Sequence, residues 1–160
     1  MPKKKIPANP AIRLLKDKNI PFELFQYDYE KKGGTAQTAR ELGVDEHSVI
    51  KTLVFENESG QLFILLMHGD CEVSAKNLAR ELGVKKIALA DPRKAFNATG
   101  YKFGGTSPFG TRQKLDVCAE KTIFDLDRIY INAGAQGLIA RIEPDALGRL
   151  IDAKAVSAAI

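Results

Sequence analysis

The segment from Gly104 to Arg112, which reads GGTSPFGTR, places the tightest restrictions on how this chain folds. Gly104, Gly105 and Gly110 allow a positive φ or the close approach of another group to bare backbone. Pro108 fixes its own φ and restricts the residue before it. The segment therefore predicts a stiff loop. Such a loop directs backbone N–H groups toward one point, which suits a carboxylate, a phosphate or a developing oxyanion.

The side chains of this loop favour a site without proving one. Thr106 and Ser107 add hydroxyl groups, and Arg112 adds positive charge. An ordinary turn between two strands explains the glycines and the proline equally well, because these residues punctuate any loop. The loop by itself therefore leaves a ligand site and a plain turn open.

The length and composition are those of one ordinary globular domain. The chain has 160 residues, 44% of them apolar and 28% charged, which excludes a disordered or fibrous chain. We expect a single domain over residues 1–160, with residues 1–8 as a flexible basic tail. The first ten residues lead into no apolar signal segment, and no apolar run is long enough for a membrane span. We therefore expect a cytoplasmic protein that contacts no membrane.

The charge of the chain restricts its partners only weakly. The net charge is +4 and the isoelectric point is near 9.0, with basic residues spread among 20 acidic ones. This balance permits an anionic partner without requiring one. A small acidic metabolite and a limited, salt-sensitive contact with nucleic acid are both compatible with it.

Helix and strand signals mix without a regular βαβ alternation, which predicts an α+β domain. Asn9, Thr35 and Ser74 are the expected N-caps of three helices. Gly43 and Gly83 are the expected C-terminal stops of two of them. Two further helices are expected from residues 92 and 144. The expected strands cover residues 22–27, 49–56, 61–67, 84–90, 115–119, 128–132 and 138–142.

Two residues within the predicted strands are candidate ligand contacts. Lys51 is a cation in the first half of a strand whose neighbours Ile50 and Leu53 favour burial. An outward-facing lysine is the simpler explanation of this pattern. Tyr27, at the rim of its strand, is likewise more often a half-buried core residue than a ligand contact.

Several kinds of catalytic centre are disfavoured by the residues present. The chain has two histidines, His47 and His68, and two cysteines, Cys71 and Cys118, which we expect to be reduced thiols. His68 and Cys71 have ligand-like spacing, but no second pair of soft ligands accompanies them, so we expect no metal. The same pair lacks the signature of a catalytic cysteine. The glycine motifs that bind nucleotides are also absent, and we expect no cofactor.

The remaining groups are a lysine, two hydroxyls and two glycine-bearing turns, the second over residues 132–137. They hold an anion and an oxyanion but supply no strong general base at neutral pH. Only an activated substrate suits such a site. An aminoacyl ester is one, because positioning and N–H donors lower the barrier to its hydrolysis.

Four segments together resemble the YbaK/EbsC family of aminoacyl-tRNA deacylases, which includes the editing insertion of bacterial prolyl-tRNA synthetases. They are NPAIRLLKDKNIPFELFQY near the start, VIKTLVF around Lys51, TGYKFGGTSPFG over residues 99–110 and IYINAGAQGL over residues 129–138. The match spans nearly the whole chain and looks most like the Cys-tRNA(Pro) deacylase branch. The fold that this resemblance implies is a mixed, partly closed β-sheet flanked by helices.

The resemblance also assigns site residues. Lys51 matches the family lysine that is needed for deacylation near the terminal adenosine of the tRNA, which overturns the simpler explanation above. Gln136 departs from the family, whose members usually carry a basic residue there, and a phosphate contact at this position stays open. The other matched positions, all substrate-binding, are Tyr27, Thr52, Gly104, Gly105, Thr106, Ser107, Pro108, Phe109, Gly110, Asn132 and Gly134.

The activity that the resemblance implies is the trans-editing of mischarged Cys-tRNA(Pro), by the protein alone or beside prolyl-tRNA synthetase. In this branch the substrate thiol attacks its own carbonyl, so the enzyme needs no nucleophile of its own. One alternative is a deacylase for another small amino acid, Ala or Ser, since pocket volume separates small side chains weakly. Another is a non-catalytic module that binds a tRNA end or a nucleotide. DNA is not an expected partner.

Overall fold

The computed structural model describes residues 8–160, so the basic tail expected over residues 1–8 lies almost entirely outside the described residues. In this part of the chain the α-helices are α1 (Pro10–Asp17), α2 (Gly34–Leu42), α3 (Ala75–Leu82), α4 (Pro92–Thr99) and α5 (Ala146–Ile151), and the 3₁₀ segments are η1 (Glu46–Ser48) and η2 (Lys121–Asp125). The strands are β1 (Glu23–Gln26), β2 (Val49–Asn57), β3 (Leu62–His68), β4 (Ile87–Leu89), β5 (Asp116–Glu120), β6 (Ile129–Asn132), β7 (Leu138–Ile142) and β8 (Lys154–Val156).

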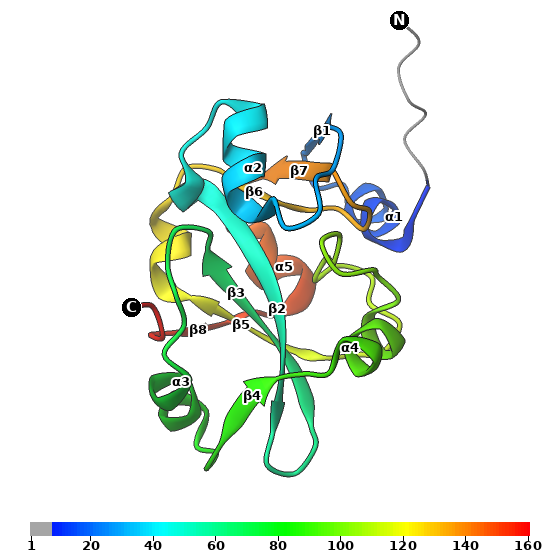
Figure 1. The fold of residues 1–160 in the computed structure, drawn as a ribbon. Helices are drawn as coiled ribbons and strands as arrows, with labels where there is room; N and C mark the ends of the chain where they lie inside the picture. The colour runs from blue at the N-terminus through cyan, green and yellow to red at the C-terminus, as the bar shows by residue number, and fades with distance from the viewer. Residues whose placement is uncertain (1–7) are drawn as a thin grey trace, which may run out of the picture.

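The strands form one mixed sheet in the order β1-β7-β6-β2-β3-β5-β8, and β4 also pairs with β2 (Figure 1). The pairs β2–β6, β3–β5 and β5–β8 are parallel, and the other pairs are antiparallel. β1 and β8 lie at the two ends of this order, so the sheet does not close into a barrel. The expected α+β class, with a mixed sheet flanked by helices, is confirmed.

Successive side chains of β3 alternate between two apolar clusters. Ile64 and Leu66 belong to the larger cluster, which includes residues of α1 and α5, whereas Leu65 and Met67 belong to the smaller one, which includes residues of α3. Because neighbouring residues of a strand point to opposite faces, the clusters lie on opposite faces of the sheet. Residues 63–68 are all buried, as the near-continuous apolar run of this strand predicts for a central strand.

Most of the expected helix ends are confirmed. The Asn9 side chain accepts a hydrogen bond from Ile12 N at 2.9 Å, and the Ser74 side chain accepts one from Asn77 N at 3.1 Å. The expectation for Thr35 was wrong, because α2 begins without a side-chain cap. Its hydroxyl donates instead to Glu46 Oε2 at 2.7 Å, which ties α2 to η1. This non-local partner outweighs the local capping preference.

The C-terminal part of the chain differs from the sequence prediction. The last helix begins at Ala146 rather than Pro144, and β8 was not predicted at all. β8 has three residues and pairs with β5, so its existence depends on a distant strand and not on local propensity. The buried Glu120 carboxylate accepts from Ala158 N at 2.6 Å and so fixes the segment after β8. No helix within residues 8–160 has the length and apolarity needed to span a bilayer.

Candidate active site

One edge of β2 is shared by two strands that leave a gap between them. β6 pairs with the start of β2 at Val49 and Ile50, and β4 pairs with its end at Phe55–Asn57. The intervening residues 51–54 have no strand partner on this edge, although β3 pairs with all of them on the other edge. The gap therefore leaves strand backbone without a strand partner in the interior of the sheet.

The hydrogen bonds of the β2–β3 hairpin show that the backbone of Thr52 faces this gap. Val49 O accepts from Gly69 N at 2.7 Å, and Asn57 N donates to Gln61 O at 3.0 Å. Since antiparallel bonding alternates along a strand, the odd-numbered residues of β2 bond to β3 and the even-numbered ones face the other edge. The buried side-chain Oγ1 of Thr52 also has no hydrogen-bond partner among the described residues. Such an unpaired buried hydroxyl is rare and marks a place where a ligand or a water supplies the bond.

Lys51 and Asn132 lie at the start of the gap. Ile50 and Ile131 form the last residue pair between β2 and β6, so the parallel register places the next residues, Lys51 and Asn132, beside each other. Both residues are half-buried. Within residues 8–160, no hydrogen bond or ion pair occupies the Lys51 ammonium. The ammonium is therefore available to an anion.

The two ends of the gap are connected to each other through β6, both glycine-bearing segments and α4, and hydrogen bonds link these parts. β6 leads into the second glycine-bearing turn, where Gln136 Nε2 donates to Phe103 O at 2.8 Å. Phe103 directly precedes the Gly104–Arg112 loop, which follows α4. At the other end of α4, Ala90 N donates to Val54 O at 2.9 Å, which closes the path at the far end of the gap. Gln136 thus joins the two glycine-bearing segments.

The two glycine-bearing segments approach each other at a distance that only glycine permits. A Cβ at Gly105 would lie 2.6 Å from the carbonyl carbon of Ala135. Gly104 has a φ of 87° and Gly134 a φ of 96°, values that glycine adopts readily and other residues rarely do. A Cβ at Gly104 would collide with the hydroxyl of Tyr29. Tyr29 was missed from the sequence, because no local pattern links it to a loop 75 positions later.

Within the Gly104–Arg112 loop, residues 107–109 are buried. Their hydrogen bonds fix the conformation of the loop. Ser107 and Phe109 are fully buried, and Ser107 Oγ accepts from Phe109 N at 3.1 Å. The Tyr101 hydroxyl donates to Phe109 O at 2.6 Å, and burial raises the pKa of Tyr101 to about 12, so it stays a neutral donor. Pro108 is buried too, whereas Thr106 is half-buried. Of the two expected hydroxyls, only that of Thr106 is partly open to solvent.

Two other matched residues contact neighbouring segments. Tyr27 N donates to Gly137 O at 2.9 Å, and the Tyr27 hydroxyl shares a 2.6 Å hydrogen bond with Thr38 Oγ1. Burial raises the pKa of Tyr27, although the bond to Thr38 opposes this shift. Gly110 has a φ of 66°, and a Cβ there would lie 2.6 Å from Pro10 O. Tyr27 and Gly110 therefore fix the turn and the loop from outside the gap.

The matched residues thus divide into two groups by position. Those of the β2 gap and of the glycine-bearing segments that Gln136 joins are Lys51, Thr52, Gly104, Gly105, Thr106, Asn132 and Gly134. Those whose contacts hold these segments in place are Tyr27, Ser107, Pro108, Phe109 and Gly110.

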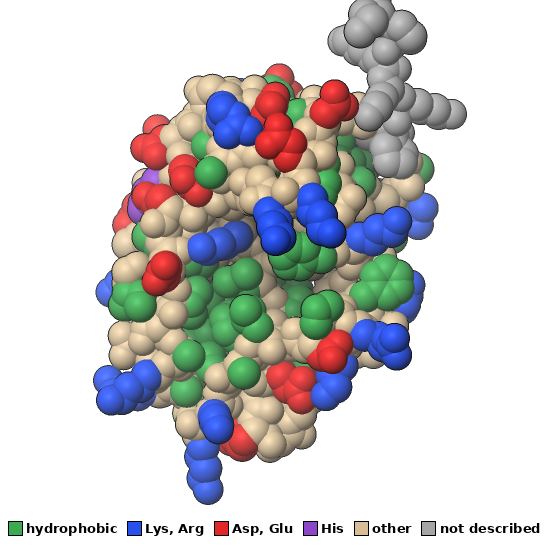
Figure 2. Space-filling view, in the orientation of Figure 1, with side chains coloured by type: hydrophobic (Ala, Val, Ile, Leu, Met, Phe, Trp, Pro, Cys, Tyr) green, Lys and Arg blue, Asp and Glu red, His purple; other side chains and the backbone are tan. Residues whose placement is uncertain are grey.

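A hollow is visible on the face that Figure 1 turns to the viewer, over β2 and the space beside it (Figure 2). Hydrophobic side chains form its floor, and several Lys or Arg side chains lie along its upper rim. This arrangement suits a ligand that places a compact group inside and carries negative charge outside.

A separate open groove of about 950 Å³ borders the C-terminal end of the loop. Pro108 and Arg112 line it, but none of the residues of the β2 gap does. The Arg112 guanidinium lies over the Phe96 ring, 5.7 Å from its centroid. Arg112, which could have added charge to the site, therefore lies at the groove and not at the gap.

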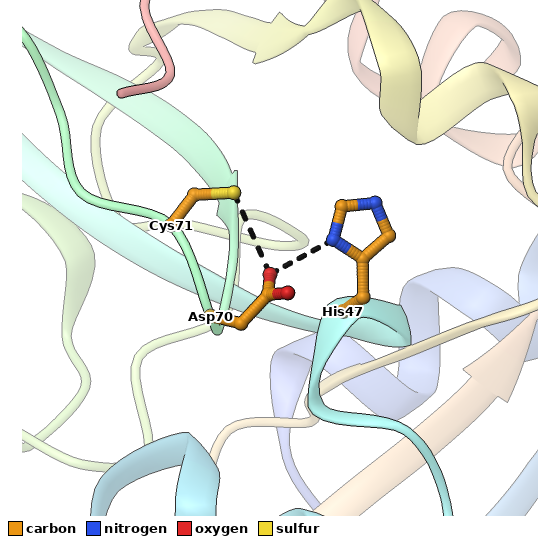
Figure 3. Close-up of side chains that lie close together, drawn as sticks. All are labelled: His47, Asp70 and Cys71. Atoms are coloured by element: carbon orange, nitrogen blue, oxygen red, sulfur yellow. Dashed lines mark hydrogen bonds and ion pairs between the residues drawn. The ribbon is translucent and has the colours of Figure 1, made fainter.

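A histidine, an aspartate and a cysteine lie close together at a third place, where η1 meets the turn after β3 (Figure 3). His47 Nδ1 lies 2.8 Å from Asp70 Oδ1, and Cys71 Sγ donates to the same oxygen at 3.5 Å. Sequence spacing suggested a pair of His68 and Cys71. Instead, His68 stacks on His47 with ring centroids 3.7 Å apart, and its Nε2 lies 2.7 Å from Thr122 Oγ1. We call His47, Asp70 and Cys71 the His-Asp-Cys cluster.

The order of contacts in the His-Asp-Cys cluster does not suit nucleophilic catalysis. In catalytic triads the histidine lies between the nucleophile and the acid, so that it removes the nucleophile's proton. Here Asp70 lies between Cys71 and His47. Burial and the hydrogen bond to Asp70 raise the pKa of the Cys71 thiol, which is therefore protonated at neutral pH. Burial opposes ionisation of Asp70, but the hydrogen bonds from His47 and Cys71 outweigh it and lower the Asp70 pKa.

Comparison with known protein families identifies the kind of domain to which the framed gap belongs. The family model of the aminoacyl-tRNA editing domain matches residues 30–150, which include β2 and both glycine-bearing segments. The chain belongs to the aminoacyl-tRNA editing domain family. This membership makes it an enzyme, an aminoacyl-tRNA deacylase, and the acylated tRNA is its substrate class.

Individual relatives agree with this membership. An Enterococcus faecalis protein named "Putative Cys-tRNA(Pro)/Cys-tRNA(Cys) deacylase EbsC" is 25% identical over 138 residues, which cover 86% of this chain and 84% of that protein. The proline–tRNA ligase of Moorella thermoacetica is 37% identical over 96 residues, 60% of this chain and 16% of the ligase. A crystal structure described as "a putative trans-editing enzyme for prolyl tRNA synthetase" has the same fold, with a TM-score of 0.81 and 19% identity over 96% of this chain and 99% of that one.

Proposed function

We propose that this deacylase clears cysteine from mischarged tRNA(Pro), and that the gap in the edge of β2 binds the terminal aminoacyl-adenosine. The observation that carries the proposal is the buried Thr52 hydroxyl without a hydrogen-bond partner among the described residues, in the gap of β2 that begins at Lys51. The Lys51 side chain leaves β2 on the other face of the sheet, the face of Met67 and Cys71, and so flanks the gap. The E. faecalis relative, whose name includes both Cys-tRNA(Pro) and Cys-tRNA(Cys), supports the choice of amino acid. The partial similarity to proline–tRNA ligases supports tRNA(Pro) as the substrate and that synthetase as a partner in the cytoplasm.

Each group at the gap has a role that its chemistry allows. The Lys51 ammonium attracts the terminal phosphate and orients the nucleotide. The Thr52 backbone N–H and hydroxyl donate to the ester oxygens, where negative charge develops during attack on the carbonyl. The half-buried Asn132, beside Lys51, offers an amide to the substrate amino group. Gly104 and Gly105 let the loop backbone approach the substrate without side-chain obstruction.

The reacting nucleophile comes from the substrate in this proposal. None of the residues that frame the gap is a histidine or a cysteine, and the Cys71 thiol is held protonated by burial and Asp70, which raise its pKa. The thiolate of the substrate cysteine attacks its own carbonyl carbon, after its proton has left to solvent. A carbon–sulfur bond forms, the ester carbon–oxygen bond breaks, and the ribose oxygen takes a proton as the tRNA leaves. The tethered nucleophile supplies the large effective concentration of an intramolecular reaction.

The rim of the site suits the end of a tRNA. Phe103 exposes 81% of its surface directly before the Gly104–Arg112 loop, next to the exposed Lys102. An exposed aromatic ring beside a cation is typical of platforms on which single-stranded bases stack. Gln136 holds the backbone of Phe103 in place and so replaces a phosphate contact with a contact between the two loops.

A deacylation panel tests the proposed specificity. The substrates are tRNA(Pro) charged with Cys, Ala, Ser or Pro, and tRNA(Cys) charged with Cys. The expected result is fastest turnover of Cys-tRNA(Pro) and survival of Pro-tRNA(Pro). Faster turnover of Ala-tRNA(Pro) or Ser-tRNA(Pro) would mean that the protein is a deacylase for a different amino acid. Equal turnover of both cysteinyl tRNAs would contradict selection for tRNA(Pro) by the domain itself.

A further inference from the structure

The His-Asp-Cys cluster combines three kinds of metal ligand at one place. The imidazole nitrogen of His47, a carboxylate oxygen of Asp70 and the sulfur of Cys71 all lie within 4.8 Å of one another. Nitrogen, oxygen and sulfur donors in one set suit borderline transition-metal ions, and they suit Mg²⁺ or Ca²⁺ poorly. We propose that His47, Asp70 and Cys71 bind a single transition-metal ion of the Zn²⁺ class.

The distances within the cluster are close to those of a tetrahedral site. Zinc bonds of about 2.0–2.3 Å to N, O and S place neighbouring ligand atoms about 3.3–3.7 Å apart. Asp70 Oδ1 and Cys71 Sγ are already 3.5 Å apart, while Asp70 Oδ1 and His47 Nδ1 are 2.8 Å apart. The His47 and Cys71 ligand atoms lie within 4.8 Å of each other, and the exposed Asp70 side chain must move by about half an ångström to reach the tetrahedral spacing from His47. The ion then replaces the protons that now link the three groups.

Contacts from neighbouring residues hold the backbone and the ring of His47 in place. Asp45 Oδ1 accepts from His47 N at 3.0 Å and fixes the start of η1. The His68 ring stacks on the His47 ring with 5° between their planes, and His68 Nδ1 lies 2.7 Å from His47 O. Thr122 fixes the other nitrogen of His68. Such outer contacts orient a ligand before the metal arrives. His68 is a positioning residue here and not a ligand.

The turn that carries Asp70 and Cys71 is fixed equally well. Gly69 N donates to Val49 O at 2.7 Å, and Cys71 N donates to His68 O at 3.1 Å. A Cβ at Gly69 would lie 2.7 Å from the Thr35 side chain, which packs the turn against α2. Both ligand-bearing segments are therefore anchored to the same end of the β2–β3 hairpin.

The cluster is also open to solvent on one side. The side chains of His47 and Asp70 are 40% and 43% exposed. An ion thus has a path of entry, and a water or another ligand has room at the fourth coordination position. The three protein ligands and one open position are the arrangement of a three-ligand zinc site.

Titration of the full-length, reduced protein with CoCl₂ tests the proposal, because Co²⁺ reports a bound thiolate by a sulfur-to-metal charge-transfer band. We expect one equivalent of Co²⁺ to produce this band and one equivalent of Zn²⁺ to remove it by displacement. Zn²⁺ should also slow the alkylation of Cys71 at least about tenfold, a readout that needs no variant.

Matched variants decide where the metal binds. Cys71→Ser should lose the band, and His47→Gln should weaken Zn²⁺ binding by at least about tenfold. Cys118→Ser, which changes the other, buried thiol, should keep both the band and the affinity. Circular dichroism checks that each variant is folded. Absence of the band in the wild type, or its survival in Cys71→Ser, would overturn the proposal, and so would unchanged alkylation of Cys71 in the presence of Zn²⁺.

Discussion

The gap in β2 and the His-Asp-Cys cluster lie near the same strand but are built in opposite ways. The gap has few reactive side chains, and its polar groups, Lys51 and the Thr52 hydroxyl, have no hydrogen-bond or ion-pair partner within the described residues, although the Lys51 charge acts on Cys71. The cluster has a histidine, an aspartate and a cysteine, and these side chains bind one another. Groups without partners await a ligand, whereas groups that satisfy one another are stable without one.

This difference separates chemical reactivity from substrate binding. The side chains with the chemistry of a nucleophile and a base, Cys71 and His47, are separated by Asp70, and this order of contacts does not suit catalysis. The hydrogen-bonding group without a partner, the Thr52 hydroxyl, is at the gap. An editing enzyme with an activated ester substrate needs such free donors more than it needs a nucleophile. The predictions below follow from this contrast, and the two largest use a residue of the cluster or a neutral position as control.

The largest effect is expected for Lys51→Ala. Loss of the cation should lower kcat/KM for deacylation by about 100-fold or more, as for other positioned charges in active sites. The free energy of unfolding should change by no more than about 0.5 kcal/mol, because the ammonium has no partner to lose. Cys71→Ser is the matched control in the cluster and should keep the wild-type rate. Equal rates for wild type and Lys51→Ala would remove Lys51 from the site.

The next largest effect is expected for Gly105→Ala. The new Cβ would lie 2.6 Å from the backbone of Ala135, so the two glycine-bearing segments must separate. We expect a loss of about 1–3 kcal/mol in stability and about tenfold in kcat/KM. Gly148→Ala in α5 is the control, because its Cβ meets nothing within 4 Å. That variant should keep full activity and unfold at the same or a slightly higher temperature. Indistinguishable behaviour of the two variants would refute the close approach.

A smaller effect is expected for Phe103→Ala. The ring is 81% exposed, so its removal should leave stability unchanged. Loss of one stacked base is worth about 1 kcal/mol or more, which raises KM for charged tRNA about fivefold while kcat stays the same. Thermal unfolding and steady-state deacylation measure the two quantities. A fall in kcat at constant KM would assign Phe103 to the chemical step instead of tRNA binding.

The smallest effect is expected for Lys102→Gln. Binding of tRNA to the wild type should depend on salt with a shallow slope of roughly two to four released counterions. If Lys102 contacts one phosphate, its loss reduces that slope by about one. Filter binding at several salt concentrations gives both slopes. A wild-type slope of about eight or more would demand an extensive basic groove in place of the compact site described above.

Local sequence signals were enough for much of the fold. The apolar runs predicted the β2–β3 hairpin, and Asn9 and Ser74 were identified as caps because their partners lie three residues away. The resemblance pointed to Lys51 and the glycine loop. The gap itself was not predictable, because it arises where β6 and β4, far apart in the chain, stop short of each other on β2.

Other features depended on contacts of the same non-local kind. Ser107 was expected to face the substrate, but the core around Phe109 buries it. Asp70 and His47 are 23 positions apart and meet only because the hairpin brings the turn after β3 to η1. Thr35 serves that same junction instead of capping α2.

The most direct test of a site without its own nucleophile is single-turnover deacylation of Cys-tRNA(Pro) and Ser-tRNA(Pro), with trapping of the released amino-acid species. Both substrates are measured with the wild type and with the double variant Cys71→Ala/Cys118→Ala. We predict much faster release of cysteine than of serine, trapping of a cyclic thioester, and most of the activity retained in the double variant. Equal rates for the two substrates would indicate an enzyme-held water, and loss of activity in the double variant would indicate an enzyme thiol; either result contradicts attack by the substrate.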